Sequence, residues 1–270
     1  MRGNISRSPK KPGVAAKNIA KNLNDIPVAG ITPFTTIDFP GRLAGVFYLQ
    51  GCPWRCRYCY NSEFWPMPSA FQDEAHLFLP AGPPTRTRVS LDKILQFLND
   101  RKGHLDGIVF SGGEPTIHEH LPVWMKEVKD MGFEIGLHTG GMVPACLEKV
   151  LPLCDWVGLD IKAPFNLYEK VTQIPGSGDA SRHSAELVIA SGVNYEFRTT
   201  VHPALLSESE ILGMSQALAA LGCKNYVLQM FRADHCPDKE LRENTIPIAG
   251  VSANLRQTLK NLFKNFLIRE

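Results

Sequence analysis

Six short apolar stretches of this sequence have the length and residue types of buried β-strands, and longer stretches with helical periodicity separate them. The strand-like stretches cover residues 44–49, 107–110, 133–137, 156–161, 195–201 and 226–230. The helix-like stretches cover residues 90–103, 121–131, 143–150, 181–191 and 207–222, and a final apolar stripe runs from Leu255 to Phe266. Strands that alternate with helices predict parallel β/α units with right-handed crossovers. Six units are fewer than the eight that close a TIM barrel. The predicted fold is therefore α/β, a partial (β/α)6 TIM-like barrel with parallel strands.

The length of the chain, 270 residues, allows one large domain or two small ones. We find no internal repeat and no second domain, so we predict a single partial-barrel domain over residues 26–270. Residues 1–24 carry six basic side chains and no acidic one. We expect residues 1–25 to be a basic, disordered arm, since a solvated terminus is commoner than one that binds nucleic acid or an acidic partner.

The cellular location follows from what the sequence lacks. No apolar run approaches the ~20 residues that a membrane-spanning helix needs. No signal-peptide cleavage site follows the first apolar stretch. The seven cysteines are an odd number and do not resemble a secreted disulfide framework. We expect a protein of the reducing cytoplasm.

Cys52, Cys56 and Cys59 fall close together, directly after the first predicted strand. Thiolates bind soft or borderline metals. Structural zinc sites usually take paired C-x2-C knuckles, whereas the spacing here is C-x3-C-x2-C without a second knuckle. Two interpretations stay open: a [4Fe–4S] cluster with one iron left for a small molecule, or zinc with a distant fourth ligand such as Cys236 or a histidine. The position of the loop at the C-terminal end of a strand favours the cluster.

Three strand-end motifs together resemble those of one enzyme family. The stretch CPWRCRYC (52–59) resembles the C-x3-C-x-aromatic-C signature of the radical S-adenosylmethionine superfamily, with Tyr58 in the aromatic position. FSGGEPT (110–116) resembles the glycine-rich loop of that family, and VGLDIKAP (157–164) resembles the D-x-K element of glycyl-radical enzyme activases. RKGHLDGIVFSGGEPT and YVLQMFR narrow the resemblance towards the activating proteins of anaerobic ribonucleoside-triphosphate reductase.

The resemblance implies a reaction as well as a fold. Cys52, Cys56 and Cys59 would be the catalytic cysteines that ligate one [4Fe–4S] cluster, with S-adenosylmethionine on the open iron. The reduced cluster would split S-adenosylmethionine into methionine and a 5′-deoxyadenosyl radical. That radical would take a hydrogen from a glycine Cα in a partner loop inserted into the barrel mouth.

The resemblance also implies cofactor-binding residues, each with a plainer structural interpretation. Gly112 and Gly113 have no side chain, so backbone could approach a cofactor closely there, but they also suit a tight turn. The side chains of Asp160 and Lys162 point to the same side of the strand end, where they could contact the cofactor or form a surface salt bridge. A related activase has a cofactor-binding histidine at the place of Arg232. Both Arg198 and Arg232 could instead be surface residues. The implied residues are Tyr58, Gly112, Gly113, Glu114, Thr139, Asp160, Lys162, Arg198 and Arg232.

Three histidines, His118, His120 and His138, lie near the predicted strand ends. LHTGG (137–141) resembles an element that reads Asp-Thr-Asn-Gly in a pyruvate formate-lyase activase and helps to hold a monovalent cation. His138 stands in place of that aspartate, and a neutral imidazole is a poor ligand for a hard cation, which argues against a bound alkali ion. His118 and His120 follow the GGEP motif, and we predict both to be surface residues of a loop.

The sequence therefore predicts a radical S-adenosylmethionine activase that installs a glycyl radical on a partner enzyme. The expected partner is anaerobic ribonucleoside-triphosphate reductase, with a flavodoxin or ferredoxin as electron donor and no membrane or nucleic-acid partner. One alternative is a family member that acts on a small metabolite, such as a deazapurine-forming synthase, with residues 64–89 as a lid. A second is a zinc-stabilised module that binds nucleic acid through the basic arm, which leaves the GGEP and D-x-K motifs unexplained.

Overall fold

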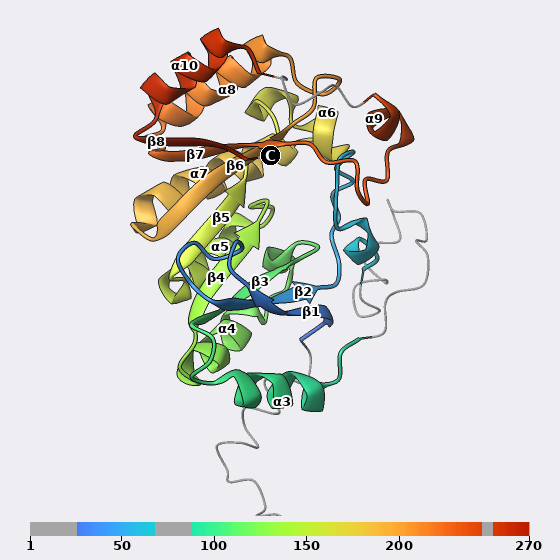
Figure 1. The fold of residues 1–270 in the computed structure, drawn as a ribbon, viewed down its shortest axis with the longest axis vertical. Coiled ribbons are helices and arrows are strands. Elements are labelled where there is room, and N and C mark those ends of the chain that lie inside the picture. Colours follow the sequence, from blue (N-terminus) through green and yellow to red (C-terminus); the bar gives the residue numbers. More distant parts are fainter. Residues whose placement is uncertain (1–25, 68–87, 245–250, 270) are drawn as a thin grey trace, which may run out of the picture.

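The computed structural model describes residues 26–67, 88–244 and 251–269 of the chain (Figure 1). The predicted basic arm, residues 1–25, and most of the stretch considered as a lid lie outside the described residues.

One open eight-stranded sheet forms the centre of the molecule, with its strands in sequence order from β1 to β8. Neighbouring strands from β2 to β8 pair in parallel, and only β1 runs antiparallel to its neighbour β2 among the described strands. The parallel α/β partial barrel predicted from the sequence is confirmed. The strands are β1 (Val28–Thr35), β2 (Ala44–Leu49), β3 (Gly107–Gly112), β4 (Glu134–Thr139), β5 (Trp156–Asp160), β6 (Asn194–Val201), β7 (Asn225–Met230) and β8 (Asn265–Arg269).

Helices cover the outer face of the curved sheet, with α4, α5, α7 and α8 following one another along it (Figure 1). Ser207 and Glu210 form the predicted capping box at the start of α8. The helices are α3 (Leu91–Arg101), α4 (Leu121–Asp130), α5 (Pro144–Val150), α6 (Glu169–Thr172), α7 (Ser177–Ser191), α8 (Glu208–Ala220), α9 (Lys239–Glu243) and α10 (Ala253–Leu262). Short 3-10 turns lie at Ser62–Phe64, Pro115–Ile117, Leu151–Leu153 and Phe165–Leu167.

The structure of the C-terminal apolar stripe differs from the prediction. The spacing predicts a single helix that reaches Phe266, after a last strand at residues 226–230. Instead α10 ends at Leu262, Phe263 adopts an extended backbone, and Phe266 belongs to β8. Phe263 and Phe266 both pack against Tyr226 of β7, with ring centroids 4.7 and 6.2 Å away. Apolar packing on the sheet therefore outweighs the helical spacing of these side chains.

Two apolar layers flank the sheet. The larger lies between the strands and the helices, and Phe47 and Phe110 are among its fully buried residues. The smaller fills the inner face and is centred on Phe39, from the loop after β1, which stacks on Trp156 of β5 at 6.1 Å. Packing by Phe39 brings the loop after β1 under the barrel, where its backbone reaches the functional site.

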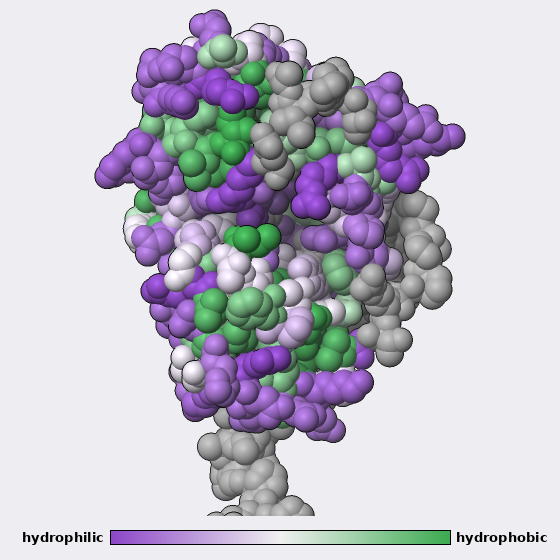
Figure 2. Space-filling view, viewed as in Figure 1, coloured by the Kyte–Doolittle hydropathy of each residue, from purple (hydrophilic) through white to green (hydrophobic). Residues whose placement is uncertain are grey.

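The surface mixes polar and apolar side chains (Figure 2). No helix in the described ranges is long and apolar enough to cross a membrane. The large apolar side chains that the described residues expose are Phe34, Ile37, Leu43, Val123 and Leu267.

Candidate active site

The three clustered cysteines line one cavity at the C-terminal ends of the parallel strands. It has a volume of about 270 Å3, and the ends of strands β3 to β7 all contribute side chains to it. The structure brings together there every predicted site residue except Arg232. From the prediction, the cavity holds Cys52, Cys56, Tyr58, Cys59, Gly112, Gly113, Glu114, Thr139, Asp160, Lys162 and Arg198.

Backbone hydrogen bonds hold the cysteine loop in place. The amide of Cys52 donates to the carbonyl of Trp65 at 3.2 Å, which closes the loop on itself. The amides of Arg55 and Arg57 donate to the carbonyls of Thr172 and Val171 in α6, at 2.9 and 3.2 Å. The short helix α6 is therefore a fixed support for the loop.

Gly112 and Gly113 let the loop after β3 pack against the cysteine loop. Gly112 has a φ of +110°, which side-chain-bearing residues rarely adopt. A Cβ atom on Gly113 would lie 2.1 Å from the carbonyl oxygen of Gly51. The close backbone approach seen here is thus between two loops of the protein.

Glu114 connects the loops that follow β3 and β4. Its side chain is buried, and its Oε1 accepts hydrogen bonds from the hydroxyls of Thr116 and Thr139 at 2.7 and 2.6 Å. Its Oε2 accepts from the amide of Gly140 at 2.8 Å. Because chain donors occupy both oxygens, Glu114 fixes the cavity wall.

Asp160, Lys162 and Arg198 form a charged group on the wall of the cysteine cavity. Arg198 Nε donates to Asp160 Oδ1 at 2.8 Å, and Lys162 Nζ lies 3.5 Å from Asp160 Oδ2. Burial acts to raise the pKa of Asp160, but the two cations outweigh it and leave that pKa below its usual value. Two cations and one carboxylate give this group a net positive charge that suits an anionic ligand.

Lys162 is also enclosed by aromatic rings. Its Nζ lies 5.9 Å from the ring centroids of both Trp54 and Tyr58, which come from the cysteine loop. Such cation–π contacts hold the ammonium group beside the cysteines.

The histidines differ from one another. His118 is buried, not on the surface as predicted, and its Nε2 lies 3.1 Å from the carbonyl of Gln50. Burial lowers the pKa of His118 to about 4. His120 is exposed, as predicted. His138 lies 2.8 Å from the carbonyl of Asp38, and burial together with Arg198 lowers its pKa to about 4, so its ring is neutral near pH 7.

The cavity also contains residues that the sequence analysis missed. Thr200 and Gln229 lie at the ends of predicted strands, a position that could have marked them. Trp54 lies inside the cysteine motif itself. Asp38 carried no signal, because its place depends on how the loop after β1 packs under the barrel.

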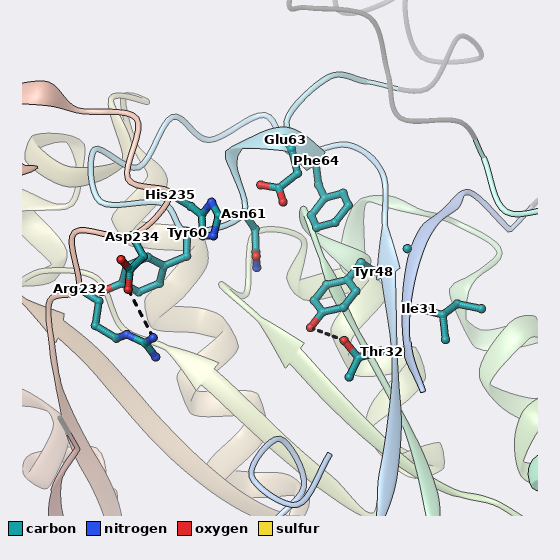
Figure 3. A pocket seen from close by; sticks show the side chains of 11 residues that line it. Ile31, Thr32, Tyr48, Tyr60, Asn61, Glu63, Phe64, Arg232, Asp234 and His235 are labelled. Carbon is teal, nitrogen blue, oxygen red and sulfur yellow. Dashed lines mark hydrogen bonds and ion pairs between the residues drawn. The ribbon is translucent and has the colours of Figure 1, made fainter. Parts of the chain in front are cut away.

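Arg232 lies in a second cavity of about 450 Å3, where its guanidinium group is 3.5 Å from Asp234 (Figure 3). The amide of Arg232 donates to the hydroxyl of Tyr60, which joins this segment to the residue after Cys59. Tyr60 and Asn61 line both cavities, so the two adjoin there. The remaining wall of the second cavity includes the stacked rings of Tyr48 and Phe64, 5.3 Å apart.

The model of the radical SAM superfamily matches residues 46–214, which span the cysteine loop and strands β2 to β6. The chain belongs to the radical SAM superfamily. It is a radical SAM enzyme, with relatives named as glycyl-radical enzyme activating enzymes.

Three known proteins are similar to this radical SAM chain in sequence or in fold. A candidate glycyl-radical enzyme activating enzyme of Methanocaldococcus jannaschii is 26% identical over 249 residues, 90% of this chain and 95% of the relative. The pyruvate formate-lyase-activating enzyme of Clostridium pasteurianum is 34% identical over 129 residues, 47% of this chain and 48% of that one. Among solved structures, SuiB of Streptococcus suis bound to precursor peptide SuiA has a TM-score of 0.61 at 12% identity. That match covers 100% of this chain and 57% of SuiB, and it shows the fold alone.

The radical SAM family implies a [4Fe–4S] cluster and S-adenosylmethionine, and the cavity residues fit both. All seven cysteines are free thiols. Burial and the charge of Cys56 raise the pKa of Cys52 well above its usual value and that of Cys59 to about 12. Three such thiols ionise together only beside a strong positive charge, which an iron–sulfur cluster supplies.

The zinc alternative finds no ligand set in the part of the chain that the structure describes. Among the described residues, no group of three histidine, cysteine or carboxylate side chains is arranged so that it could hold a single metal ion. Cys236 does not line the cavity, and its Sγ lies 3.3 Å from the carbonyl of Arg57 instead. A [4Fe–4S] cluster differs from zinc because it binds each cysteine through a different iron.

Proposed function

We propose that this radical SAM enzyme is an activase that installs a glycyl radical on a partner enzyme, anaerobic ribonucleoside-triphosphate reductase. The observation that carries the radical chemistry of this proposal is the shared cavity, in which three cysteines and a net-positive group of Asp160, Lys162 and Arg198 line the same walls. The choice of partner rests on the resemblance of residues 101–116 and 226–232 to the activating proteins of that reductase. The relative from M. jannaschii supports the activase class, since the match covers nearly all of both chains.

The roles of the residues follow from the cavity. We propose that Cys52, Cys56 and Cys59 hold one [4Fe–4S] cluster. When bound and reduced, the cluster supplies the electron that cleaves S-adenosylmethionine to methionine and the 5′-deoxyadenosyl radical. Lys162 and Arg198 would attract the methionyl carboxylate, because Asp160 neutralises only one of them.

The neighbouring loops give this cavity its shape. Glu114 and Thr139 hold the loops after β3 and β4 together, which fixes the backbone around the cofactor. Tyr58 packs beside Lys162 and limits the positions of its ammonium group. We exclude Arg232 from the proposed cofactor site, because it lines the second cavity.

The second cavity supports the proposal that the substrate is a protein. This cavity of about 450 Å3 adjoins the cysteine cavity at Tyr60 and Asn61, so a segment of a partner could extend through both.

We propose that residues 26–270 act as one domain in the cytoplasm, with a flavodoxin or ferredoxin as electron donor.

The proposal is tested by mixing the iron-loaded protein with the reductase, S-adenosylmethionine and dithionite under anaerobic conditions. The account predicts a glycyl-radical signal in the electron paramagnetic resonance spectrum, absent with Cys56→Ala. Cleavage of S-adenosylmethionine without any glycyl radical would reject this partner and favour the alternative, a small-metabolite enzyme.

A further inference from the structure

Arg55 lies inside the cysteine loop, between Trp54 and Cys56, with its side chain wrapped around that loop. Its Nη1 donates to the carbonyls of Cys52 and Trp54 at 2.6 and 2.8 Å. Its guanidinium carbon lies 5.2 Å from the ring centroid of Trp65. With its own amide bonded to Thr172, the residue is fixed by both backbone and side chain.

The charge of Arg55 has no carboxylate partner among the described residues. Burial lowers the pKa of its guanidinium group, whereas the charges of Cys52, Cys59 and Cys56 act in the opposite direction. The guanidinium group thus lies against the backbone of Cys52, and the negative charges that act on it are those of the three cysteines that would hold the cluster.

Arg57, two residues further along the same loop, is the contrasting case. Its Nε lies 2.6 Å from Asp238, and its Nη2 lies 2.9 Å from Glu240. Two carboxylates thus neutralise Arg57, although it has the same side chain and belongs to the same loop. Lys162 and Arg198, the cations on the cavity wall, share Asp160.

Arg55 is also absent from the walls of both cavities, so it is not placed to touch S-adenosylmethionine. Its influence on a bound cluster is therefore electrostatic. One electron from an external low-potential donor makes the cluster and its three thiolates more negative by one charge. A fixed cation stabilises the reduced form more than the oxidised form, and net charge near a cluster is a known determinant of its potential.

We propose that Arg55 is a positioning residue that sets the cluster's redox balance: its guanidinium, fixed within the cysteine loop and without a carboxylate partner among the described residues, raises the midpoint potential of the [4Fe–4S] cluster. This inference rests on the proposed function, because it requires the cluster to bind at these cysteines.

The test is an anaerobic redox titration of the iron-loaded protein without S-adenosylmethionine, followed by the electron paramagnetic resonance signal of the reduced cluster. Iron and sulfide per chain are measured first. We expect Arg55→Gln to titrate at a more negative potential than the unaltered protein at equal cluster content. We expect Arg57→Gln, the matched control, to shift the potential less than Arg55→Gln does, because Arg57 is less buried than Arg55 and solvent screens its charge more strongly.

Arg55→Lys separates charge from hydrogen bonding, because it keeps the charge and loses the guanidinium fork. A potential close to that of the unaltered protein supports the inference, and it decides the question if Arg55→Gln does not retain its cluster. The inference is overturned if Arg55→Gln titrates unchanged, if Arg57→Gln shifts equally, or if Arg55→Lys shifts as far as Arg55→Gln. Absence of any cluster in the unaltered protein would instead reject the proposed function.

Discussion

Asp160 accepts from one cation at 2.8 Å and lies 3.5 Å from another, which leaves one positive charge of this group for a ligand. Lys162 has the longer and weaker contact with Asp160 and is held by two aromatic rings instead. It is therefore the cation best placed to turn to an incoming carboxylate.

Lys162→Ala should retain the cluster but weaken the binding of S-adenosylmethionine. A hydrogen bond to a charged group contributes roughly 1.5–3 kcal/mol, so we expect the Kd to rise about 10- to 100-fold. Anaerobic calorimetric titration measures this, with Lys170→Ala as the control, because Lys170 pairs with Glu210 on the exposed surface. Unaltered affinity in Lys162→Ala would remove Lys162 from the proposed site.

His118 should make the stability of the protein depend on pH. Its folded-state pKa of about 4 lies below the value of 6.5 for a free histidine. Between those values the unfolded chain binds the proton and the folded chain does not, so stability is lost as the pH falls below 6.5. The free energy of unfolding should decrease by up to about 1.4 kcal/mol per pH unit.

His118→Gln should reduce this slope, since glutamine can still donate to Gln50 but does not titrate. Urea unfolding at several pH values from about 7 to 5.5 measures the slope. His138 contributes in the same direction, because its pKa is also lowered to about 4. Equal slopes in the two proteins would show that folding does not lower the pKa of His118.

At the scale of elements, the loop after β3 supports the cysteine loop by direct backbone packing. The amide of Gly113 donates to Leu49 at 2.9 Å, and the amide of Glu114 donates to Gly51 at 2.8 Å. These contacts leave no room for a side chain at position 113, where a Cβ would lie 2.1 Å from a carbonyl oxygen.

Gly113→Ala should therefore displace the cysteine loop and lower the iron bound per chain. Gly213→Ala is the control, because a Cβ at that position in α8 meets nothing within 4 Å. Iron content and the visible absorption of the cluster measure the effect. Full iron content in Gly113→Ala would mean that the two loops separate without consequence for the cluster.

The sequence predicts the inner strands well, because buried parallel strands are continuous apolar runs. It does not reveal β1, whose run is interrupted by Pro33, a residue tolerated at the edge of a sheet. It also hides β8, because Phe263 and Phe266 are spaced as on a helix. The helices α6 and α9, of four and five residues, are too short for periodicity to detect.

At the scale of the whole molecule, the site is assembled from residues far apart in the chain, from Asp38 to Gln229. The motifs predict most of its residues, since each motif lies at a strand end. They also place Arg232 in this site, whereas the structure has it in the wall of the second cavity, with its backbone amide bonded to Tyr60. A cofactor that contacts so many strand ends should stabilise the fold.

Iron removal should accordingly lower the urea concentration at the midpoint of unfolding. We expect a chelator to shift the unaltered protein to the lower midpoint that Cys56→Ala shows with or without chelator. Fluorescence of the tryptophans follows the transition. The same midpoint before and after iron removal would show that the cavity is fully formed without its cluster.

The central claim is that Cys52, Cys56 and Cys59 support radical cleavage of S-adenosylmethionine. The most direct measurement is chromatography of the products after anaerobic reconstitution with iron and sulfide, reduction with dithionite and addition of S-adenosylmethionine. The account predicts 5′-deoxyadenosine from the unaltered protein and from Cys223→Ala, a buried cysteine outside the cavity, and none from Cys56→Ala. Binding of zinc but not iron, or a full cluster that yields no 5′-deoxyadenosine, would contradict it.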